Sequence, residues 1–378
     1  MDEMHKNTAP DIAAATAAME GNDFAAARAH LDRAAAARPD DADIPRLLAT
    51  AHLSEGNFAA SLAAIDAGLA LKPGDVFFTR MRELVDGYRV YQDGMLEKRR
   101  SVYMDYPPVV HLETFAKCNA SCCFCPYETL DRIGVRMSDA LISKIIDDLT
   151  AIPASVPFFI APQKVNEPFL DKRIFDVFAE IAAKLANASL LINTNAAALD
   201  DRNITKLSQV TNVARMWISL NDHRAEQYEA VMKLPFDRTL ERLDAIHKAK
   251  ADGRLSFPVQ VGRVADGSPA DAEFVDWVTR RYPHFSPDLL ARGDWAGQTE
   301  LETAAPMAIG CQRWFDLSIT ATGQVALCCM DGRAAHPIGD ITETHALDIY
   351  NGAGYRALRE SGDSRLDLGT PCNTCSFY

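Results

Sequence analysis

The sequence lacks any apolar run of the ~20 residues that a membrane-spanning helix requires. Residues 1–10 are polar and of mixed charge, so they do not resemble a secretory signal. Positive charge is also scarce, with 39 Lys and Arg against 52 Asp and Glu. The resulting net charge of −13 repels phosphate backbones and argues against general nucleic-acid binding. We therefore expect a cytoplasmic protein that does not act at a membrane.

The chain is nevertheless long and unusually supplied with cysteine. Its 378 residues are enough for two or three domains, each with its own core. Apolar residues at 48% and charged residues at 24% are typical of soluble globular proteins. Nine cysteines without a secretion signal indicate metal ligands rather than disulfides. These features favour an oxygen-sensitive metalloenzyme.

The N-terminal region is alanine-rich and repeats itself with an offset of 34 residues, so that Phe24 recurs as Phe58 and Asp32 as Asp66. This period resembles that of tetratricopeptide repeats, and a generic alanine-rich helical bundle is the alternative. We predict repeats over residues 1–75 and a capping helix with a linker over residues 76–105. Because two repeats seldom bury a continuous core, we expect this module to rely on the rest of the protein or on a partner.

Over residues 106–300, short apolar runs alternate with helical stretches, which predicts βα units, a parallel sheet and an α/β fold. Polar residues follow the predicted strands, where ligands gather in such sheets. Over residues 301–378, alternation around Thr322-Gly323 predicts a hairpin, followed by two short helices. The predicted strands lie at residues 109–115, 156–160, 190–193, 214–220 and 257–261, with a sixth at 288–290.

Three thiols, Cys118, Cys122 and Cys125, stand at a Cys-x3-Cys-x2-Cys spacing with Phe124 before the last. Such a loop can wrap three thiolates around a [4Fe–4S] cluster and leave one iron without a protein ligand. The alternatives are a zinc knuckle, which usually offers Cys-x2-Cys pairs, or buried thiols. The loop resembles the signature of radical S-adenosylmethionine (radical SAM) enzymes, in which the open iron chelates the amino and carboxylate groups of SAM.

This resemblance implies a partial (β/α)6 barrel and a set of SAM contacts. The second-strand motif stands as Val165-Asn166-Glu167-Pro168, which keeps the glutamate of the usual Gly-Gly-Glu-Pro but lacks both glycines. Met232 stands where an arginine is often seen, with Lys233 beside it. The residues matched to cofactor-binding positions are Phe124, Asn166, Glu167, Asn195, Ser219 and Asn221.

The C-terminal cysteines resemble the SPASM/twitch extension of radical SAM enzymes. Cys328 follows Gly323 with four residues between, and the chain nearly ends in Cys372-x2-Cys375. The resemblance implies that Cys311, Cys328, Cys372 and Cys375 hold one auxiliary [4Fe–4S] cluster, as in twitch-type cyclitol dehydrogenases, and leaves Cys123 and Cys329 over. A four-cysteine zinc ribbon and buried thiols are the alternatives.

Family resemblance also implies the reaction. The reduced cluster cleaves SAM to a 5′-deoxyadenosyl radical, which abstracts a substrate hydrogen, and the auxiliary cluster oxidises the substrate radical. A flavodoxin or ferredoxin is the implied electron donor. Arg263, Arg313 and Asp331 are candidate catalytic residues that could equally be structural.

Three functions are open at this point. A radical SAM oxidoreductase acting on a polar small molecule, such as a sugar or aminocyclitol, is the first. A peptide maturase that cross-links, epimerises or oxidises its substrate is the second, with the repeat module holding the peptide or a protein partner. A non-enzymatic scaffold with structural metal sites is the third, and two separate cysteine groups argue against it.

Overall fold

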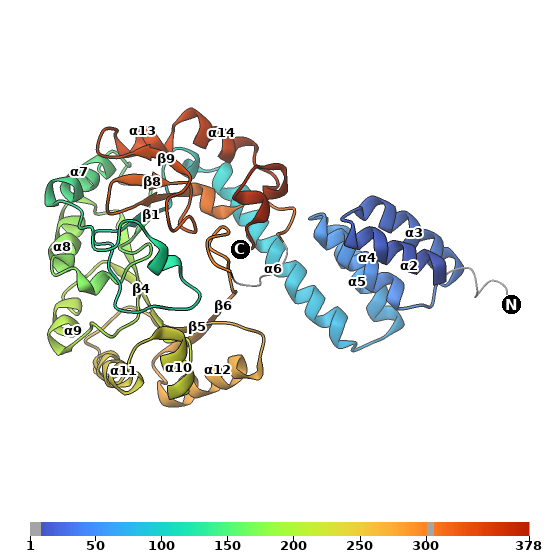
Figure 1. Cartoon of the computed structure of the whole chain (residues 1–378), viewed down its shortest axis with the longest axis horizontal. Helices are drawn as coiled ribbons and strands as arrows, with labels where there is room; N and C mark the ends of the chain where they lie inside the picture. The colour runs from blue at the N-terminus through green and yellow to red at the C-terminus, as the bar shows by residue number, and fades with distance from the viewer. Residues whose placement is uncertain (1–8, 301–305, 378) are drawn as a thin grey trace. The chain divides into compact units, whose positions relative to one another are not determined.

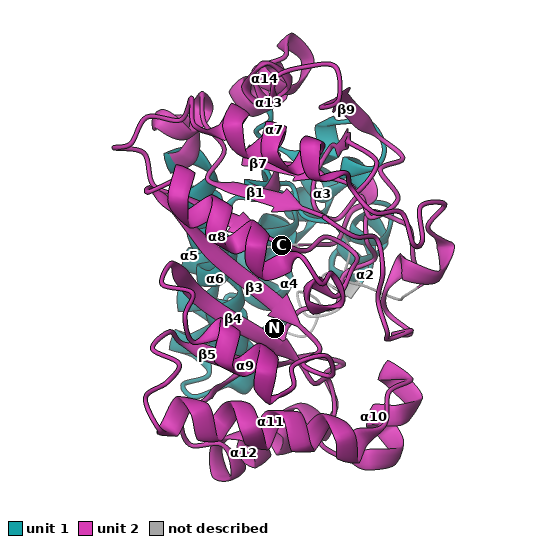
Figure 2. Cartoon of the chain, turned by 90° about the vertical axis from the view of Figure 1, so that its left-hand side faces the viewer, with its two compact units in different colours: residues 1–97, 305–312, 362–373 teal, residues 98–304, 313–361, 374–378 magenta. Residues whose placement is uncertain are grey.

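The computed structural model describes residues 9–300 and 306–377, which divide into two compact units (Figure 2). The first unit comprises residues 1–97, 305–312 and 362–373, and the second comprises residues 98–304, 313–361 and 374–378. No helix in the described ranges is long and apolar enough to cross a membrane. Residues 1–8 lie outside the described residues, and they include most of the N-terminal segment whose polarity does not resemble a secretory signal. The start of the domain predicted from residue 301 also lies outside them.

Two helical hairpins form most of the first unit, and they follow the 34-residue period. The second helix of each hairpin has 14 residues and begins at Phe24 or at Phe58. The residues before them, Asp23 and Asn57, cap these helices by accepting hydrogen bonds from backbone N–H groups three residues on. The predicted repeat is therefore confirmed, and it extends to the residues that cap the equivalent helices. The four helices are α2 (Ala9–Glu20), α3 (Phe24–Ala37), α4 (Asp43–Ser54) and α5 (Phe58–Leu71).

The predicted capping helix is α6 (Val76–Arg99), and it buries Phe78 completely. Gly68 of α5 makes room for this ring, because a Cβ at residue 68 would lie 2.1 Å from a Phe78 ring atom. Further along α6, the Gln92 side-chain oxygen accepts a hydrogen bond of 2.9 Å from the backbone N–H of Gly310. The first unit therefore joins the repeats to a short segment that lies more than 200 residues later in the chain.

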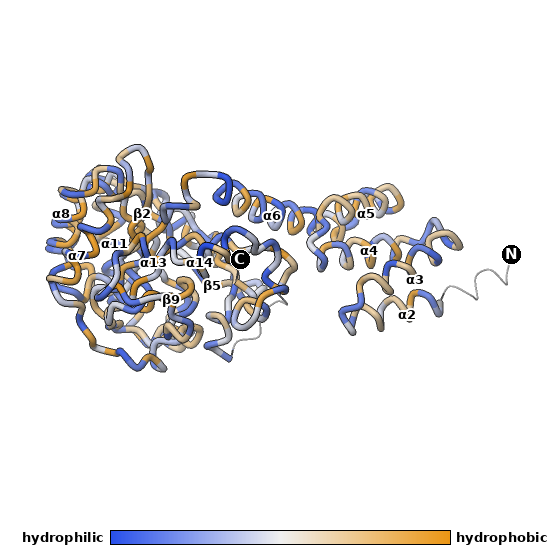
Figure 3. Tube along the Cα trace, turned by 90° about the horizontal axis from the view of Figure 1, so that it is seen from above, coloured by the Kyte–Doolittle hydropathy of each residue, from blue (hydrophilic) through white to orange (hydrophobic). Residues whose placement is uncertain are grey.

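The second unit is built on a sheet whose strands β1 to β6 are parallel and adjacent in chain order (Figure 1). Its apolar core includes the fully buried Ile145, Phe178 and Leu190. Hydrophobic colour accordingly marks β2 and helices α7 and α8 in Figure 3. The strands are β1 (Val109–Leu112), β2 (Phe158–Ala161), β3 (Ala188–Thr194), β4 (Val213–Ser219), β5 (Val259–Val264) and β6 (Ser286–Leu290). The helices between them are α7 (Asp139–Leu149), α8 (Ile174–Lys184), α9 (Asp201–Leu207), α10 (Ala225–Met232), α11 (Phe236–Ala251) and α12 (Pro269–Arg281).

The sheet continues beyond β1 into the C-terminal region, with β7 (Asp316–Ile319) parallel to β1. The predicted hairpin follows, because β8 (Gln324–Ala326) runs antiparallel to β7 around Gly323, whose φ is 91°. Among the described strands β6 pairs only with β5, so the sheet stays open as a partial barrel. The remaining elements are β9 (Pro337–Asp340), α13 (Ala346–Tyr350), α14 (Ala353–Ser361) and the 3-10 turns η1 (Val102–Met104), η2 (Pro126–Thr129), η3 (Pro168–Leu170), η4 (Gln312–Phe315), η5 (Arg365–Asp367) and η6 (Cys372–Thr374).

Candidate active site

A cavity of about 400 Å³ lies in the second unit, lined by residues of the parallel strands and of the segments that follow them. The three thiols of the loop at residues 118–125 line it, together with Glu167 and Asn195. The structure therefore brings together the predicted cluster loop and the predicted SAM contacts from three different segments of the chain. This is the arrangement expected where parallel strands end side by side.

Backbone hydrogen bonds hold the cysteine loop in place. The N–H of Ser121 donates to the carbonyl of Met232 at 3.2 Å, and the N–H of Cys123 donates to that of Val231 at 3.2 Å. At the other end, the N–H of Glu167 donates to the carbonyl of Lys117 at 2.9 Å. The loop is thus fixed both to the end of α10 and to the segment after β2.

The environment of the three thiols suits an iron–sulfur cluster. Burial raises the pKa of Cys118 to about 11 and that of Cys125 to about 12. Burial also raises the pKa of Cys122 above its usual range, and the neighbouring Cys125 and Cys118 sulfurs raise it further. Thiols that perturb one another in this way lie close together, and a bound metal would hold them as thiolates. The three cysteines therefore fit the cluster that their spacing implies.

Glu167 is buried, and both of its carboxylate oxygens accept hydrogen bonds. Oε1 accepts from Thr194 Oγ1 at 2.7 Å, and Oε2 accepts from the backbone N–H of Asn195 at 2.7 Å. Burial raises the pKa of Glu167 to about 7 although these donors act in the opposite direction. The carboxylate is thus held rigidly at the cavity wall with acceptor capacity left for a ligand N–H.

The other predicted cofactor contacts differ in how they meet the cavity. Phe124, Asn166 and Ser219 line it, and the Asn166 Nδ2 atom is buried without a hydrogen-bond partner among the described residues. Such a donor can serve a ligand acceptor. Asn221 is not among the described lining residues. Its φ is 66°, its Nδ2 donates to Ser219 Oγ at 2.7 Å, and its Oδ1 accepts from the N–H of Val264.

The three candidate catalytic residues lie in different surroundings. Arg263 is buried in an ion network with Asp222, Asp266 and Asp271, each at 2.7 Å, and is not among the described residues that line the cavity. Arg313 does line it, and its guanidinium lies 3.3 Å from Asp316.

Asp331, the third candidate, is completely buried and is also outside the described cavity lining. It accepts hydrogen bonds from the Gln298 side chain at 2.7 Å and from the N–H groups of Ala335 and His336 at 2.9 Å. These contacts hold the turn after β8. The catalytic roles of all three residues stay predictions.

The four predicted auxiliary ligands fall in both compact units. Cys311 and Cys372 belong to the first unit, and Cys328 and Cys375 belong to the second. Within the first unit, the Tyr91 hydroxyl lies 3.5 Å from the Cys311 sulfur. The four cysteines as one ligand set stay a prediction from the sequence.

Several cavity residues escaped the reasoning from sequence. The interior of the barrel adds Asn193, Arg215, Trp217 and Asp288 to the lining. The Trp217 indole N–H donates to Asp288 at 2.9 Å, which joins β4 to β6. Residues 215, 217 and 219 are two apart on β4, so their side chains share one face of the strand. Polar residues at every second position of a predicted strand were therefore the signal that could have identified Arg215 and Trp217 as cavity residues.

Comparisons with known proteins agree with this architecture. Residues 311–376 match the SPASM family, an iron–sulfur cluster-binding domain, and residues 18–76 match a tetratricopeptide repeat family. No curated protein sequence matched the chain significantly.

Solved structures of radical SAM enzymes share the fold. BtrN in complex with AdoMet and 2-DOIA has 16% identity and a TM-score of 0.50, over 71% of this chain and 92% of that one. Streptococcus suis SuiB bound to precursor peptide SuiA has 13% identity and a TM-score of 0.55, over 75% and 71%. The enzyme anSMEcpe with bound AdoMet and Cp18Cys peptide has 12% identity and a TM-score of 0.50, over 69% and 83%. The chain therefore combines tetratricopeptide repeats, the fold of radical SAM enzymes and a SPASM iron–sulfur cluster-binding domain.

Proposed function

We propose that the chain is a radical SAM oxidoreductase that cleaves SAM reductively, abstracts a hydrogen atom from a polar small molecule, and oxidises the substrate radical through an auxiliary [4Fe–4S] cluster. The observation that carries the proposal is the single cavity lined by the three thiols of residues 118–125 and by Glu167 and Asn195. A bound cluster would supply the electron that converts SAM to a 5′-deoxyadenosyl radical.

The residues around that cavity have distinct tasks in this proposal. Cys118, Cys122 and Cys125 hold the cluster and leave one iron to SAM. Glu167 accepts a hydrogen bond from the SAM amino group, and the Asn166 side chain donates one to an acceptor of the cofactor. Asn195 lies between them and the cluster loop, because its Nδ2 donates to Asn119 Oδ1 at 2.8 Å.

Charged side chains in the cavity lining favour a polar small molecule, such as a sugar or aminocyclitol. In this proposal the cavity of about 400 Å³ also holds the cluster and SAM, which leaves room only for a small substrate. Arg215 and Asp288 offer charges of opposite sign to hydroxyl and amino groups, and the Trp217 ring offers an apolar face. The SPASM match supports the auxiliary cluster as the electron acceptor. We expect a flavodoxin or ferredoxin as the electron donor, in the reducing cytoplasm that clusters and free thiols require.

A second candidate function is peptide maturation, favoured by the repeats at residues 18–76. Tetratricopeptide-type solenoids present extended binding surfaces, which could hold a peptide or a carrier. Two of the structures with the same fold, SuiB and anSMEcpe, were solved with peptides bound. Product formation from a peptide, and none from sugars or aminocyclitols, would decide for this alternative.

The test of the proposed function is 5′-deoxyadenosine formation by the anaerobically reconstituted protein with dithionite, measured by mass spectrometry. The triple variant Cys118→Ala, Cys122→Ala, Cys125→Ala should lose the activity, because it leaves no protein ligand for the cluster. Cys123→Ala is the matched control, since Cys123 is exposed and lies within the same loop. Equal turnover by the triple variant and the wild type would refute the proposal.

A further inference from the structure

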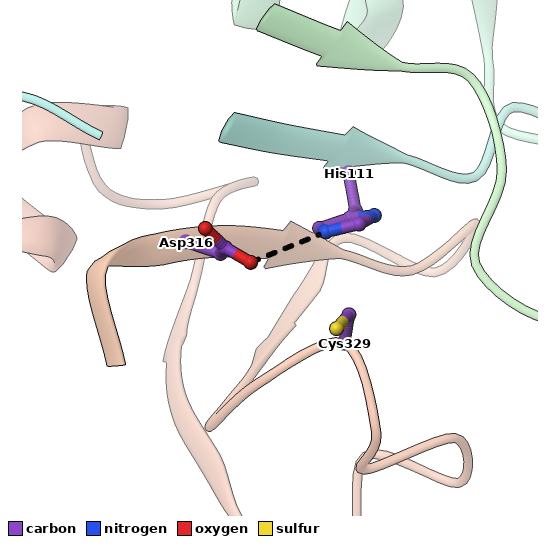
Figure 4. Close-up of side chains that lie close together, drawn as sticks. All are labelled: His111, Asp316 and Cys329. Carbon is purple, nitrogen blue, oxygen red and sulfur yellow. Dashed lines mark ion pairs between the residues drawn. The ribbon is translucent and has the colours of Figure 1, made fainter. Parts of the chain in front are cut away.

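A second group of ligand-type side chains lies at the cavity, apart from the seven cysteines considered so far. It consists of His111 on β1, Asp316 at the start of β7, and Cys329 after β8 (Figure 4). One ligand atom from each residue lies within 4.8 Å of the other two. We propose that these three side chains bind a single divalent cation of the zinc type.

Sheet register explains why the three residues meet. In the parallel pair of β1 and β7, Val109 pairs with Asp316 and His111 pairs with Ser318. Residues two apart share a face of the sheet, so His111 and Asp316 are diagonal neighbours on one face. The chain after β8 then passes over this face and brings Cys329 against them, as Figure 4 shows.

The histidine is oriented as metal-binding histidines are. Its Nδ1 lies 3.4 Å from the backbone carbonyl oxygen of Gln163 and can donate a hydrogen bond to it. That leaves Nε2 as the ligand atom. Nε2 is buried and lies 3.5 Å from Asp316 Oδ2, with which it forms an ion pair when the ring is protonated (Figure 4). A bound cation would take the place of that proton between the two residues. A metal-binding imidazole usually has one ring nitrogen hydrogen-bonded to a backbone carbonyl, and its other nitrogen faces the ion and the anionic ligands.

The carboxylate and the thiol complete a donor set with the chemistry of a zinc site. Asp316 is 1% exposed, and the Arg313 guanidinium 3.3 Å from its Oδ2 leaves lone pairs for an ion. One carboxylate and one thiolate carry two negative charges, against the two positive charges of the ion and the one of Arg313. Nitrogen, oxygen and sulfur are all zinc ligands. Zinc bonds of about 2.0–2.3 Å hold ligand atoms about 3.5 Å apart. His111 Nε2 and Asp316 Oδ2 already have this separation, so binding requires only that the Cys329 sulfur approach by roughly 1 Å.

The site leaves one coordination position for a ligand from the cavity. Tetrahedral zinc with three protein ligands keeps a fourth position for water or substrate. His111 and Cys329 both line the cavity, so this position faces the space assigned to substrate. The fourth ligand is therefore an oxygen of water or of a substrate hydroxyl or carboxylate. This inference goes beyond the proposed function and does not depend on SAM cleavage.

The experiment uses the full-length protein after anaerobic reconstitution of its clusters. The protein is incubated with zinc chloride and desalted, and zinc and iron are counted by mass spectrometry. We expect about one zinc per chain in the wild type and at least a tenfold loss in Cys329→Ala and in His111→Asn, because three ligands become two. Cys123→Ala is the matched control, an exposed cysteine that also directly follows a proposed cluster ligand.

Three results would overturn the site. The wild type could retain no more zinc than Cys329→Ala, or Cys123→Ala could lose as much zinc as Cys329→Ala. Alternatively, Cys329→Ala could lose iron at an unchanged melting temperature, which would make Cys329 a cluster ligand. Zinc retained by a wild-type protein that forms no 5′-deoxyadenosine would instead refute the proposed function and leave the zinc site standing.

Discussion

Glu167 illustrates how the site holds a charge where water cannot solvate it. The carboxylate is 2% exposed, and no cationic side chain among the described residues contributes to the shift of its pKa. Burial therefore prevails over its three hydrogen-bond donors and raises the pKa to about 7. The residue is destabilising in its ionised form before a ligand binds, which is a common property of groups placed for function.

Without SAM, this residue should make stability pH-dependent. The folded state holds the Glu167 proton up to about pH 7, whereas the unfolded state releases it near 4.5. The contribution of protonated Glu167 to the free energy of unfolding is therefore fully present below pH 4.5 and is lost as pH rises through 7. The difference in unfolding free energy between the wild type and Glu167→Gln should fall by about 2–3 kcal/mol from pH 5 to pH 8, measured by urea titration. A pH-independent difference would contradict the assignment.

Gly262 on β5 is required by the indole that lines the cavity. A Cβ at residue 262 would lie 1.9 Å from the Trp217 ring, so Gly262→Ala must displace that ring. We expect a loss of about 1–3 kcal/mol in unfolding free energy from overpacking. Gly354→Ala is the matched control, because no atom outside the neighbouring helix backbone lies within 4 Å of the added Cβ. Equal melting temperatures for the two variants would refute this packing argument.

At the scale of whole elements, local sequence patterns predicted most of the fold. The 34-residue offset indicated the starts of α3 and α5, and apolar runs indicated the strands from β1 to β6. The sixth strand was predicted at residues 288–290, and β6 begins two residues earlier, at Ser286. Pairing between distant segments was not predictable in this way. Nothing in the local pattern of residues 316–319 specifies β1 as the partner of β7.

The same limit applies to the site. Cysteine spacing indicated the cluster loop because its ligands are local, and Glu167 followed from the resemblance of one short motif. His111, Asp316 and Cys329 come from three segments that are spread over more than 200 residues of the chain, and the cysteine pattern assigned no role to Cys329. The acidic partners of Arg263 could not be predicted from the sequence either, because tertiary packing around a turn brings them to the arginine.

A buried ion pair joins the segment after the cluster loop to the end of β1 and to the sheet extension. Arg132 donates to both carboxylate oxygens of Glu113, at 2.6 and 3.1 Å, and to the carbonyl of Gly332 at 2.8 Å. Glu113 also accepts a hydrogen bond from the N–H of Ala321. One pair thus links the end of β1, the segment after the cysteines, and the turns on either side of β8.

Removing one partner of this pair should cost far more than removing both charges. Arg132→Met leaves the Glu113 charge buried, so we expect a loss of about 3–5 kcal/mol in unfolding free energy. Adding Glu113→Gln removes that charge and should restore part of the loss, in a double-mutant cycle followed by urea unfolding. A double variant as unstable as the sum of its two single variants would show that the two residues act independently.

For the whole molecule, the division into units separates the repeats from the cavity. Every described residue that lines the cavity belongs to the second unit, whereas helices α2 to α5 belong to the first. The repeats contain no cysteine. We therefore expect them to bind a partner or a carried substrate and to take no part in SAM cleavage.

Deleting residues 1–75 tests this division of labour. The deletion uncovers Phe78 on α6, which is otherwise fully buried, so the truncated protein should carry Phe78→Ser to stay soluble. We expect 5′-deoxyadenosine formation without substrate to stay within about twofold of the full chain, because the groups that bind SAM are all retained. Turnover of a peptide or carrier-bound substrate should fall by about tenfold or more, since its effective concentration at the cavity is lost. Iron content serves as the control for intact clusters. A soluble, iron-loaded truncation that no longer cleaves SAM would place the repeats within the catalytic machinery.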